Sequence, residues 1–115
     1  MVNEVKKEIE NIIKKEVEVV VKKEVFNDLS VIKDFIVTVA SVDAAMKYVD
    51  TLEQEIYSLA YLAPCIALTT SRTAKKYHPQ ARKVVTHNKK WTIIFHIEGS
   101  FAVVDKILPA KMMIS

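Results

Sequence analysis

The sequence predicts an α+β fold, an antiparallel twisted sheet of about four strands with an N-terminal helical hairpin packed on one face. Three observations predict it. A short run near the start has the two-residue period of a strand, two longer runs have the apolar spacing of amphipathic helices, and three strand-like runs separated by turn residues close the chain. Because 50% of the 115 residues are apolar and only one is Gly, we expect one compact core built from long regular elements.

The chain divides into two segments, residues 1–15 and a single domain of residues 16–115. The first segment places apolar residues at helical spacing between Lys and Glu: Val2, Val5, Ile9 and Ile12. This spacing predicts an N-terminal amphipathic helix, or an arm that becomes ordered against a partner. Every second residue from Val17 to Val21 is Val, which predicts a strand with one buried face.

Two amphipathic helices follow the strand. The apolar stripe of the first consists of Val25, Leu29, Ile32, Ile36 and Val39. The stripe of the second consists of Ala45, Val49, Leu52, Ile56 and Leu59. Ser41 is a suitable N-cap for the second helix, Asp43 is favourable in its first turn, and Pro64 is expected to mark its end. The short interval between the stripes predicts an antiparallel hairpin.

The second half of the chain predicts a basic, irregular segment at residues 69–80 and then three strands at 82–87, 91–97 and 101–108. A turn at residues 88–90 and the flexible Gly99 separate the strands. Period two places Trp91, Ile93, Phe95 and Ile97 on one face of the middle strand. The same rule places Phe101, Val103, Asp105 and Ile107 on one face of the last strand.

Several classes of protein are excluded or disfavoured by the residues. Cys65 is the only cysteine, which rules out an internal disulfide and fits a reducing compartment, and its apolar neighbours predict that it is buried. No apolar stretch approaches the length of a membrane span, and the N-terminus lacks a secretory apolar region, so we expect a cytoplasmic protein. No nucleotide-binding or metal-binding motif occurs, so neither a cofactor nor a metal is expected.

The charges are divided unevenly along the chain. Between Ile56 and Ile97 there is no Asp or Glu, although this stretch holds all three His and seven Lys or Arg residues. A folded surface built from it would attract polyanions such as nucleic acid. Ordinary solvated lysines would give the same composition, so both interpretations stay open. The residues that we expect to contact nucleic acid are Arg72, Lys75, Lys76, Lys89, Lys90 and Lys111.

Metal-independent cleavage of RNA needs a base for the 2′-hydroxyl proton, cations for the phosphorane and an acid for the leaving oxygen. The residue types are present at Arg82, Lys83 and His87, which are our candidate catalytic residues. On a strand, Lys83 and His87 would share one face. His96 lies mid-strand among core positions, so we interpret it as part of the fold.

Several segments resemble RelE/ParE-type toxins of bacterial type II toxin–antitoxin systems. Residues 28–36, 44–52 and 56–64 resemble the helical half of that family, and residues 78–84, 90–99 and 101–108 resemble its closing strands. The resemblance implies a toxin that a small antitoxin neutralises by wrapping around it. RelE-like members cut mRNA on the ribosome, whereas ParE-like members poison DNA gyrase.

The site residues implied by the resemblance are only partly matched. Arg82, Lys83 and His87 fall where the mRNA-cutting members place basic or catalytic residues, and Lys111 falls where they place a C-terminal basic residue. The Tyr or His-Tyr pair near the end of those members has no counterpart in this sequence. That gap favours a ParE-like member, whereas the basic stretch supports the nuclease branch, and on the second ground we expect an mRNA endonuclease that acts on ribosome-bound mRNA and is held by a cognate antitoxin. A ParE-like gyrase inhibitor without catalysis, and a non-enzymatic module that binds RNA or protein, remain the alternatives, and the oligomeric state is open.

Overall fold

The computed structural model describes residues 17–113, so the helix or arm expected at residues 1–15 lies outside the described part. The first half contains strand β1 (Glu18–Val21), helices α2 (Lys23–Val39), α3 (Val42–Tyr57) and α4 (Leu59–Leu62), and the 3-10 turn η1 (Ala63–Cys65). The second half contains helix α5 (Arg72–Lys75), strands β2 (Arg82–Val85), β3 (Trp91–Glu98) and β4 (Phe101–Pro109), and the 3-10 turn η2 (Ala110–Met112). The predicted α+β class is confirmed.

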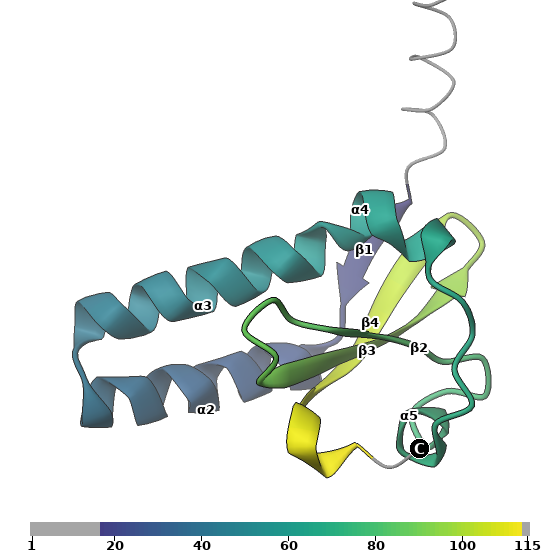
Figure 1. Ribbon diagram of the computed structural model, residues 1–115. Helices are drawn as coiled ribbons and strands as arrows, with labels where there is room; N and C mark the ends of the chain where they lie inside the picture. The colour runs from purple at the N-terminus through teal and green to yellow at the C-terminus, as the bar shows by residue number, and fades with distance from the viewer. Residues whose placement is uncertain (1–16, 114–115) are drawn as a thin grey trace, which may run out of the picture.

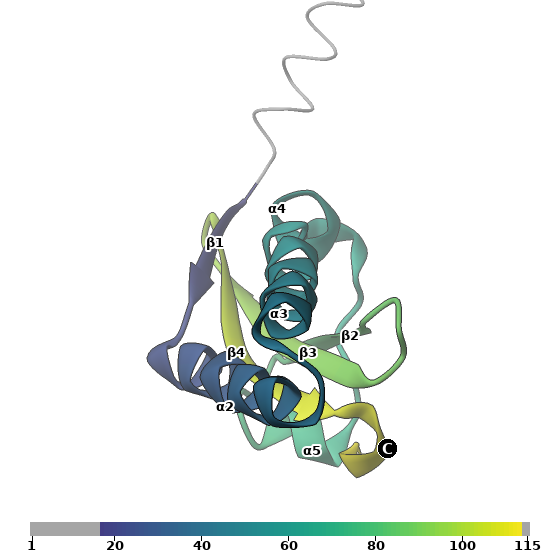
Figure 2. The same cartoon turned by 90° about the vertical axis from the view of Figure 1, so that its left-hand side faces the viewer.

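Helices α2 and α3 form the predicted hairpin, which projects beyond the sheet as two antiparallel rods (Figures 1 and 2). Ser41 caps α3 as predicted, because its hydroxyl accepts a hydrogen bond of 3.0 Å from the amide of Ala44. Both apolar stripes supply buried core residues: Val25, Leu29 and Ile32 from α2, and Ala45, Val49, Leu52 and Ile56 from α3. Helix α3 ends at Tyr57, before Pro64, and the chain continues through α4 into η1, which contains Pro64.

The four strands lie in the order β1-β4-β3-β2, and the sheet is mixed. Strand β1 runs parallel to β4, with Glu18 opposite Phe101 and Val21 opposite Val104, whereas the other two pairings are antiparallel. The prediction of a wholly antiparallel sheet is therefore wrong at β1. Alternation along a strand shows which face is buried, but it does not show the direction of the neighbouring strand.

A β-bulge in β4 changes which of its residues face the hairpin. Ile94 pairs with Lys106 and Phe95 with Val104, so Asp105 is an extra residue on β4. The β4 residues in the main core are Ala102, Val104 and Ile107. The predicted common face of Phe101, Val103, Asp105 and Ile107 is therefore wrong, because the bulge interrupts period two. The predicted β3 face is confirmed: Trp91, Ile93, Phe95 and Ile97 all belong to the main core or pack against it.

The face of the sheet away from the hairpin is covered by residues 66–81, which we name the strap. Ala74 and Ala81 of the strap pack with Ile94 in a second, small core. Residues 69–80 of the strap are predicted to be irregular, yet they contain the one-turn helix α5, whose N-cap Ser71 accepts a hydrogen bond from the amide of Ala74. Cys65, just before the strap, is exposed rather than buried as predicted. No helix within residues 17–113 is both long and apolar enough to span a membrane.

Candidate functional site

The candidate site lies where α3 meets the turn between β2 and β3. Oε1 of Glu55 on α3 accepts a hydrogen bond of 2.6 Å from the backbone amide of His87. The same oxygen contacts Nδ1 of the His87 ring. Only 15% of the Glu55 side chain is exposed, against 94% for His87. Glu55 therefore orients an imidazole ring that is otherwise open to solvent, an arrangement suited to proton transfer.

The turn that carries His87 is held by its own hydrogen bonds. The amide of Lys89 donates to the carbonyl of Thr86 at 2.8 Å, and Lys89 has a left-handed φ of 62°. Oδ1 of Asn88 accepts from the hydroxyl of Thr86 at 2.7 Å and from the amide of Lys90 at 3.0 Å. These bonds fix the directions in which Lys89 and Lys90 leave the turn.

Tyr48 on α3 ties the hairpin to this turn. Its hydroxyl accepts hydrogen bonds from Nε1 of Trp91 at 2.8 Å and from Nδ2 of Asn88 at 3.1 Å. The positions of Glu55 and His87 relative to one another are therefore supported by a second contact between the same two elements.

A depression with a volume of about 410 Å³ lies beside the turn, and we name it the lysine depression. Its lining residues come from the turn, the start of β3 and the chain after β4: Lys89, Lys90, Trp91, Pro109, Ala110 and Lys111. The amide of Ala110 donates to the carbonyl of Lys90 at 2.8 Å, which joins the two segments. The fold thus brings together three of the six residues expected to contact nucleic acid, although Lys111 is distant from the other two in sequence.

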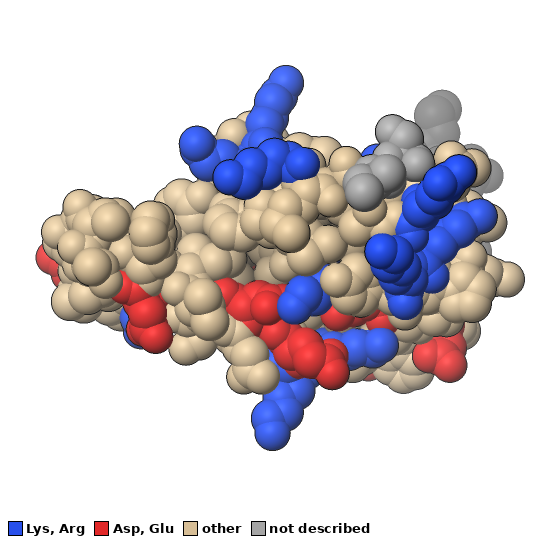
Figure 3. Space-filling model, turned by 90° about the horizontal axis from the view of Figure 1, so that it is seen from below, with Lys and Arg blue, Asp and Glu red and all other residues tan. Residues whose placement is uncertain are grey.

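The other three, Arg72, Lys75 and Lys76, belong to α5 or follow it directly, on the strap. Figure 3 shows Lys and Arg side chains in separate groups, with uncharged surface between two of the groups and with Asp and Glu beside other Lys and Arg side chains. The acid-free stretch of the sequence therefore does not form one continuous basic patch.

The three candidate catalytic residues have different surroundings. The guanidinium of Arg82 is partly buried and donates to the carbonyl of Ile66, and its Nε has no hydrogen-bond partner among residues 17–113. Lys83 is half-buried on β2. Strand β2 ends at Val85, so the alternation expected to place His87 beside Lys83 does not extend to His87. No hydrogen bond or ion pair within the described residues joins any two of the three side chains.

An apolar groove with a volume of about 600 Å³ adjoins the lysine depression. It is lined by Val31, Ile32, Phe35 and Ile36 of α2, Ala44 and Tyr48 of α3, and Lys90 and Trp91. Val31 and Phe35 are 67% and 65% exposed, which is unusual for large apolar side chains. Because Lys90 and Trp91 line both hollows, the apolar groove and the lysine depression form one composite surface.

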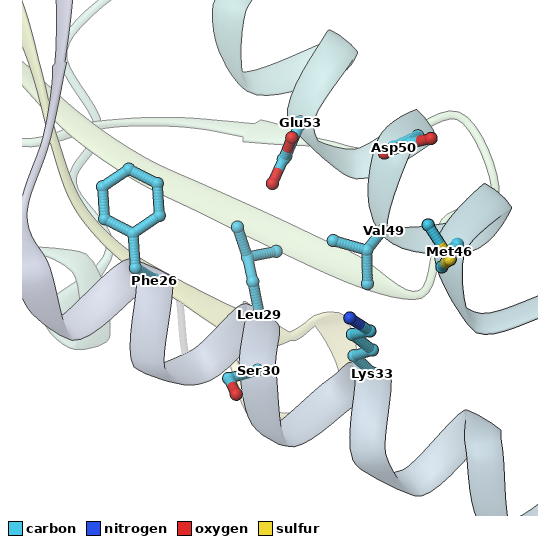
Figure 4. A pocket seen from close by; sticks show the side chains of 8 residues that line it. All are labelled: Phe26, Leu29, Ser30, Lys33, Met46, Val49, Asp50 and Glu53. Carbon is cyan, nitrogen blue, oxygen red and sulfur yellow. The ribbon is translucent and has the colours of Figure 1, made fainter. Parts of the chain in front are cut away.

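A second hollow between α2 and α3 has a volume of about 310 Å³ (Figure 4). Leu29 and Val49 lie between the two helices, whereas Lys33, Asp50 and Glu53 place charges of both signs around them. This mixture gives no preference for a polyanion. No group of three or more His, Cys, Asp or Glu that could hold a metal ion occurs within residues 17–113.

Glu55 and Tyr48 are the site residues that sequence reasoning missed. They lie 32 and 43 residues before their partners His87 and Trp91. The one available signal was that Glu55 is the last acid before the acid-free stretch.

Comparison with known proteins gives one informative result. No family model matches the sequence, and no curated protein matches it. Among solved structures, the fold is similar to that of a chain from the "Chromosomal ParDE TA system from P. aeruginosa", with a TM-score of 0.71 and 18% identity. The similarity covers 83% of this chain and 97% of the other chain. The resemblance to RelE/ParE-type toxins is thereby confirmed for the fold.

Proposed function

We propose that this protein is the toxin of a type II toxin–antitoxin pair, and that it acts in the cytoplasm as an endonuclease on ribosome-bound mRNA. The toxin class is supported by one observation above all, the shared fold with a chain of a ParDE toxin–antitoxin system. The nuclease activity is supported by the Glu55–His87 pair, because His87 lies on the same turn as Lys89 and Lys90 of the lysine depression.

His87 performs the proton transfer in the proposed reaction. Its free ring nitrogen takes the proton of an RNA 2′-hydroxyl while Glu55 holds the other ring nitrogen. The 2′-oxygen then attacks the adjacent phosphorus, and the bond to the 5′-oxygen breaks. The products are a 2′,3′-cyclic phosphate and a 5′-hydroxyl, whose proton comes from water or from the protonated His87.

The cations hold the RNA backbone and stabilise its charge. Lys89, Lys90 and Lys111 contact phosphates in the lysine depression and stabilise the phosphorane. Lys83 pairs with Ile94, which faces the strap, so Lys83 lies on the face of the sheet away from Glu55 and takes no part in this step. Arg82 has a structural role, because its guanidinium donates a hydrogen bond to the carbonyl of Ile66 in the strap. Arg72, Lys75 and Lys76 form a second, separate contact with the RNA or the ribosome.

The antitoxin covers the composite surface. An amphipathic segment with apolar residues on one side and Asp or Glu on the other would fill the apolar groove and neutralise the lysine depression. Its acids would also speed association with the basic depression. Neutralisation follows, because the RNA site is occupied.

A second candidate function is inhibition of DNA gyrase without catalysis, and the named system of the solved structure, ParDE, favours it. In that case the composite surface binds protein only, and His87 has no chemical role. A binding module for RNA or protein without toxicity is the third candidate.

Induced expression in a bacterial host separates these candidates. The nuclease arrests growth and translation and leaves mRNA cut inside codons on ribosomes, and His87→Ala restores growth. Lys47→Ala, which removes an exposed charge on α3 outside the lysine depression, is the control and leaves cleavage in place. Growth arrest with intact mRNA and a DNA-damage response would instead identify a gyrase inhibitor, and unimpaired growth would identify the binding module.

A further inference from the structure

Two histidines lie stacked on the face of the sheet away from the hairpin. The ring of His78 on the strap is parallel to the ring of His96 on β3, with an interplanar angle of 4° and 3.7 Å between the centroids. His96 is only 4% exposed. A histidine ring stacked on a buried one is unusual, because imidazole rings can take a proton near neutral pH.

His96 is surrounded by charged groups from three elements. Its Nδ1 lies 2.7 Å from Oδ2 of the buried Asp105 on β4, and its Nε2 lies 3.5 Å from Oε2 of Glu98 at the end of β3. The other oxygen of Asp105 lies 2.7 Å from Nζ of Lys22, just before α2. The negative charge of Glu24 also favours the charged form of Lys22 and helps to raise its pKa. The His96 ring therefore lies between two carboxylates.

The ring of His78 is held by a backbone amide. Its Nδ1 accepts a hydrogen bond of 3.0 Å from the amide of Gln80. A backbone amide can only donate, so Nδ1 carries no proton in this arrangement. A proton added there would break the bond to Gln80. It would also place a positive charge over a ring that, when protonated, carries the same charge.

We propose that the His78–His96 stack is a proton-operated latch for the strap. The strap rests on the sheet while Nδ1 of His78 accepts the hydrogen bond from Gln80 and the two rings pack face to face. When His78 takes a proton, the rings separate and the part of the strap around α5 lifts. The start of the strap stays attached, because Arg82 holds Ile66 and pairs with Leu68.

The movement has two consequences for the surface. Ile94 loses its cover of Ala74 and Ala81, so an apolar part of the sheet is exposed. Arg72, Lys75 and Lys76 move with α5, so one group of cations changes position relative to the rest. Acidity thereby alters both the apolar and the charged surface on this face.

Hydrogen exchange of the full chain between pH 7.5 and pH 5.5 tests the latch. Once exchange rates are corrected for intrinsic chemistry, protection of residues 72–81 falls by up to about tenfold per pH unit, because opening takes up one proton. Protection of β3 stays unchanged. His78→Phe keeps a flat ring on His96 but cannot take a proton, so its strap protection does not depend on pH. His87→Phe, at an exposed histidine outside the stack, keeps the pH dependence of the wild type.

Three results would overturn the proposal: strap protection in the wild type that does not change with pH, a His78→Phe variant that responds like the wild type, or an equal loss of protection in the strap and β3. The last result would mean global unfolding. Ring signals of His78 and His96 in NMR give an independent measurement, and protonation of one ring must shift the signals of the other.

Discussion

Nε1 of Trp91 at the start of β3 donates a 2.8 Å hydrogen bond to the hydroxyl of Tyr48 on α3, across 43 residues of sequence. The same hydroxyl accepts a hydrogen bond from Asn88 in the turn before β3. The hairpin and the turn are therefore joined beside the Glu55–His87 pair, and Tyr48 and Trp91 both line the apolar groove. Stability and the candidate site depend on this same junction.

Replacing Tyr48 by Phe is expected to lower the free energy of unfolding by about 1–2 kcal/mol. The ring still fills its place, but two donors lose their shared acceptor, and each hydrogen bond contributes about 1 kcal/mol. Urea denaturation measures the change. Tyr57→Phe is the matched control, because Tyr57 is 47% exposed on the same helix and its hydroxyl has no hydrogen-bond partner among residues 17–113. Equal losses for both variants would show that the Tyr48 contacts contribute nothing specific.

Glu55→Gln is expected to slow RNA cleavage by about 10-fold to 100-fold, less than the 10²-fold to 10⁴-fold typical of losing a general base at His87. The reason is that in the proposed reaction Glu55 acts by orienting His87, which alone exchanges the proton with RNA. Cleavage rates on a single-stranded RNA with purified ribosomes measure both changes, and Glu53→Gln on the same helix is the control.

The double variant Glu55→Gln, His87→Ala decides whether the two residues act together. If Glu55 works only through His87, the double variant is no slower than His87→Ala alone. If instead the rate losses of the two single variants multiply in the double variant, Glu55 has a role that is independent of His87.

The comparison of sequence with structure shows which features local pattern can reveal. Helical stripes and the Ser41 cap depend on neighbours within one or two turns, so they could be predicted. The parallel pairing of β1 and the bulge at Asp105 depend on contacts between distant segments, which periodicity does not contain. The Glu55–His87 pair also depends on a contact between distant segments, so the sequence could propose His87 but not Glu55.

The pair of Lys22 and Asp105 makes stability sensitive to alkaline pH. The hydrogen bond to Asp105 raises the pKa of the Lys22 ammonium above its usual value. A raised pKa means that the contribution to stability is complete below the ordinary lysine value, about 10.4, and is lost as the pH rises through the folded-state pKa. Lys22→Met is therefore expected to be less stable than the wild type at pH 8, with a difference that shrinks toward pH 11.

Chemical denaturation at a series of pH values between 8 and 11 measures this difference. Lys23→Met is the control, because the neighbouring Lys23 makes no ion pair within the described residues and its substitution adds no such pH dependence. If the free energy of unfolding of Lys22→Met is as far below that of the wild type at pH 11 as at pH 8, the ammonium of Lys22 is not the source of the stabilisation.

Phe35→Ser is expected to weaken antitoxin binding without weakening the fold. Phe35 is 65% exposed in the apolar groove, so its loss changes the free energy of unfolding by only about 0.5 kcal/mol. An aromatic anchor of an interface typically contributes about 2 kcal/mol or more, which corresponds to about a 30-fold weaker complex. Co-expression with the product of an adjacent small reading frame tests this, since the variant would escape neutralisation. Val39→Ser, an exposed apolar change outside the groove lining, should remain neutralised.

The lysine depression and the α5 cations should differ in their contribution to RNA binding, and salt dependence can separate them. Binding of a single-stranded RNA weakens with salt at a slope of about −0.7 per neutralised phosphate. Changing Lys89, Lys90 and Lys111 to Gln removes three cations from one depression, so the slope should become shallower by about 2 with an oligouridylate probe. The matched variant changes Arg72, Lys75 and Lys76 to Gln and removes the same charge from the separate group on α5. If the lysine depression binds the RNA backbone, the salt dependence of binding falls strongly in the first variant and little in the second. Equal losses would mean that the RNA responds to net charge alone, and a greater loss for the α5 variant would move the binding site to the strap.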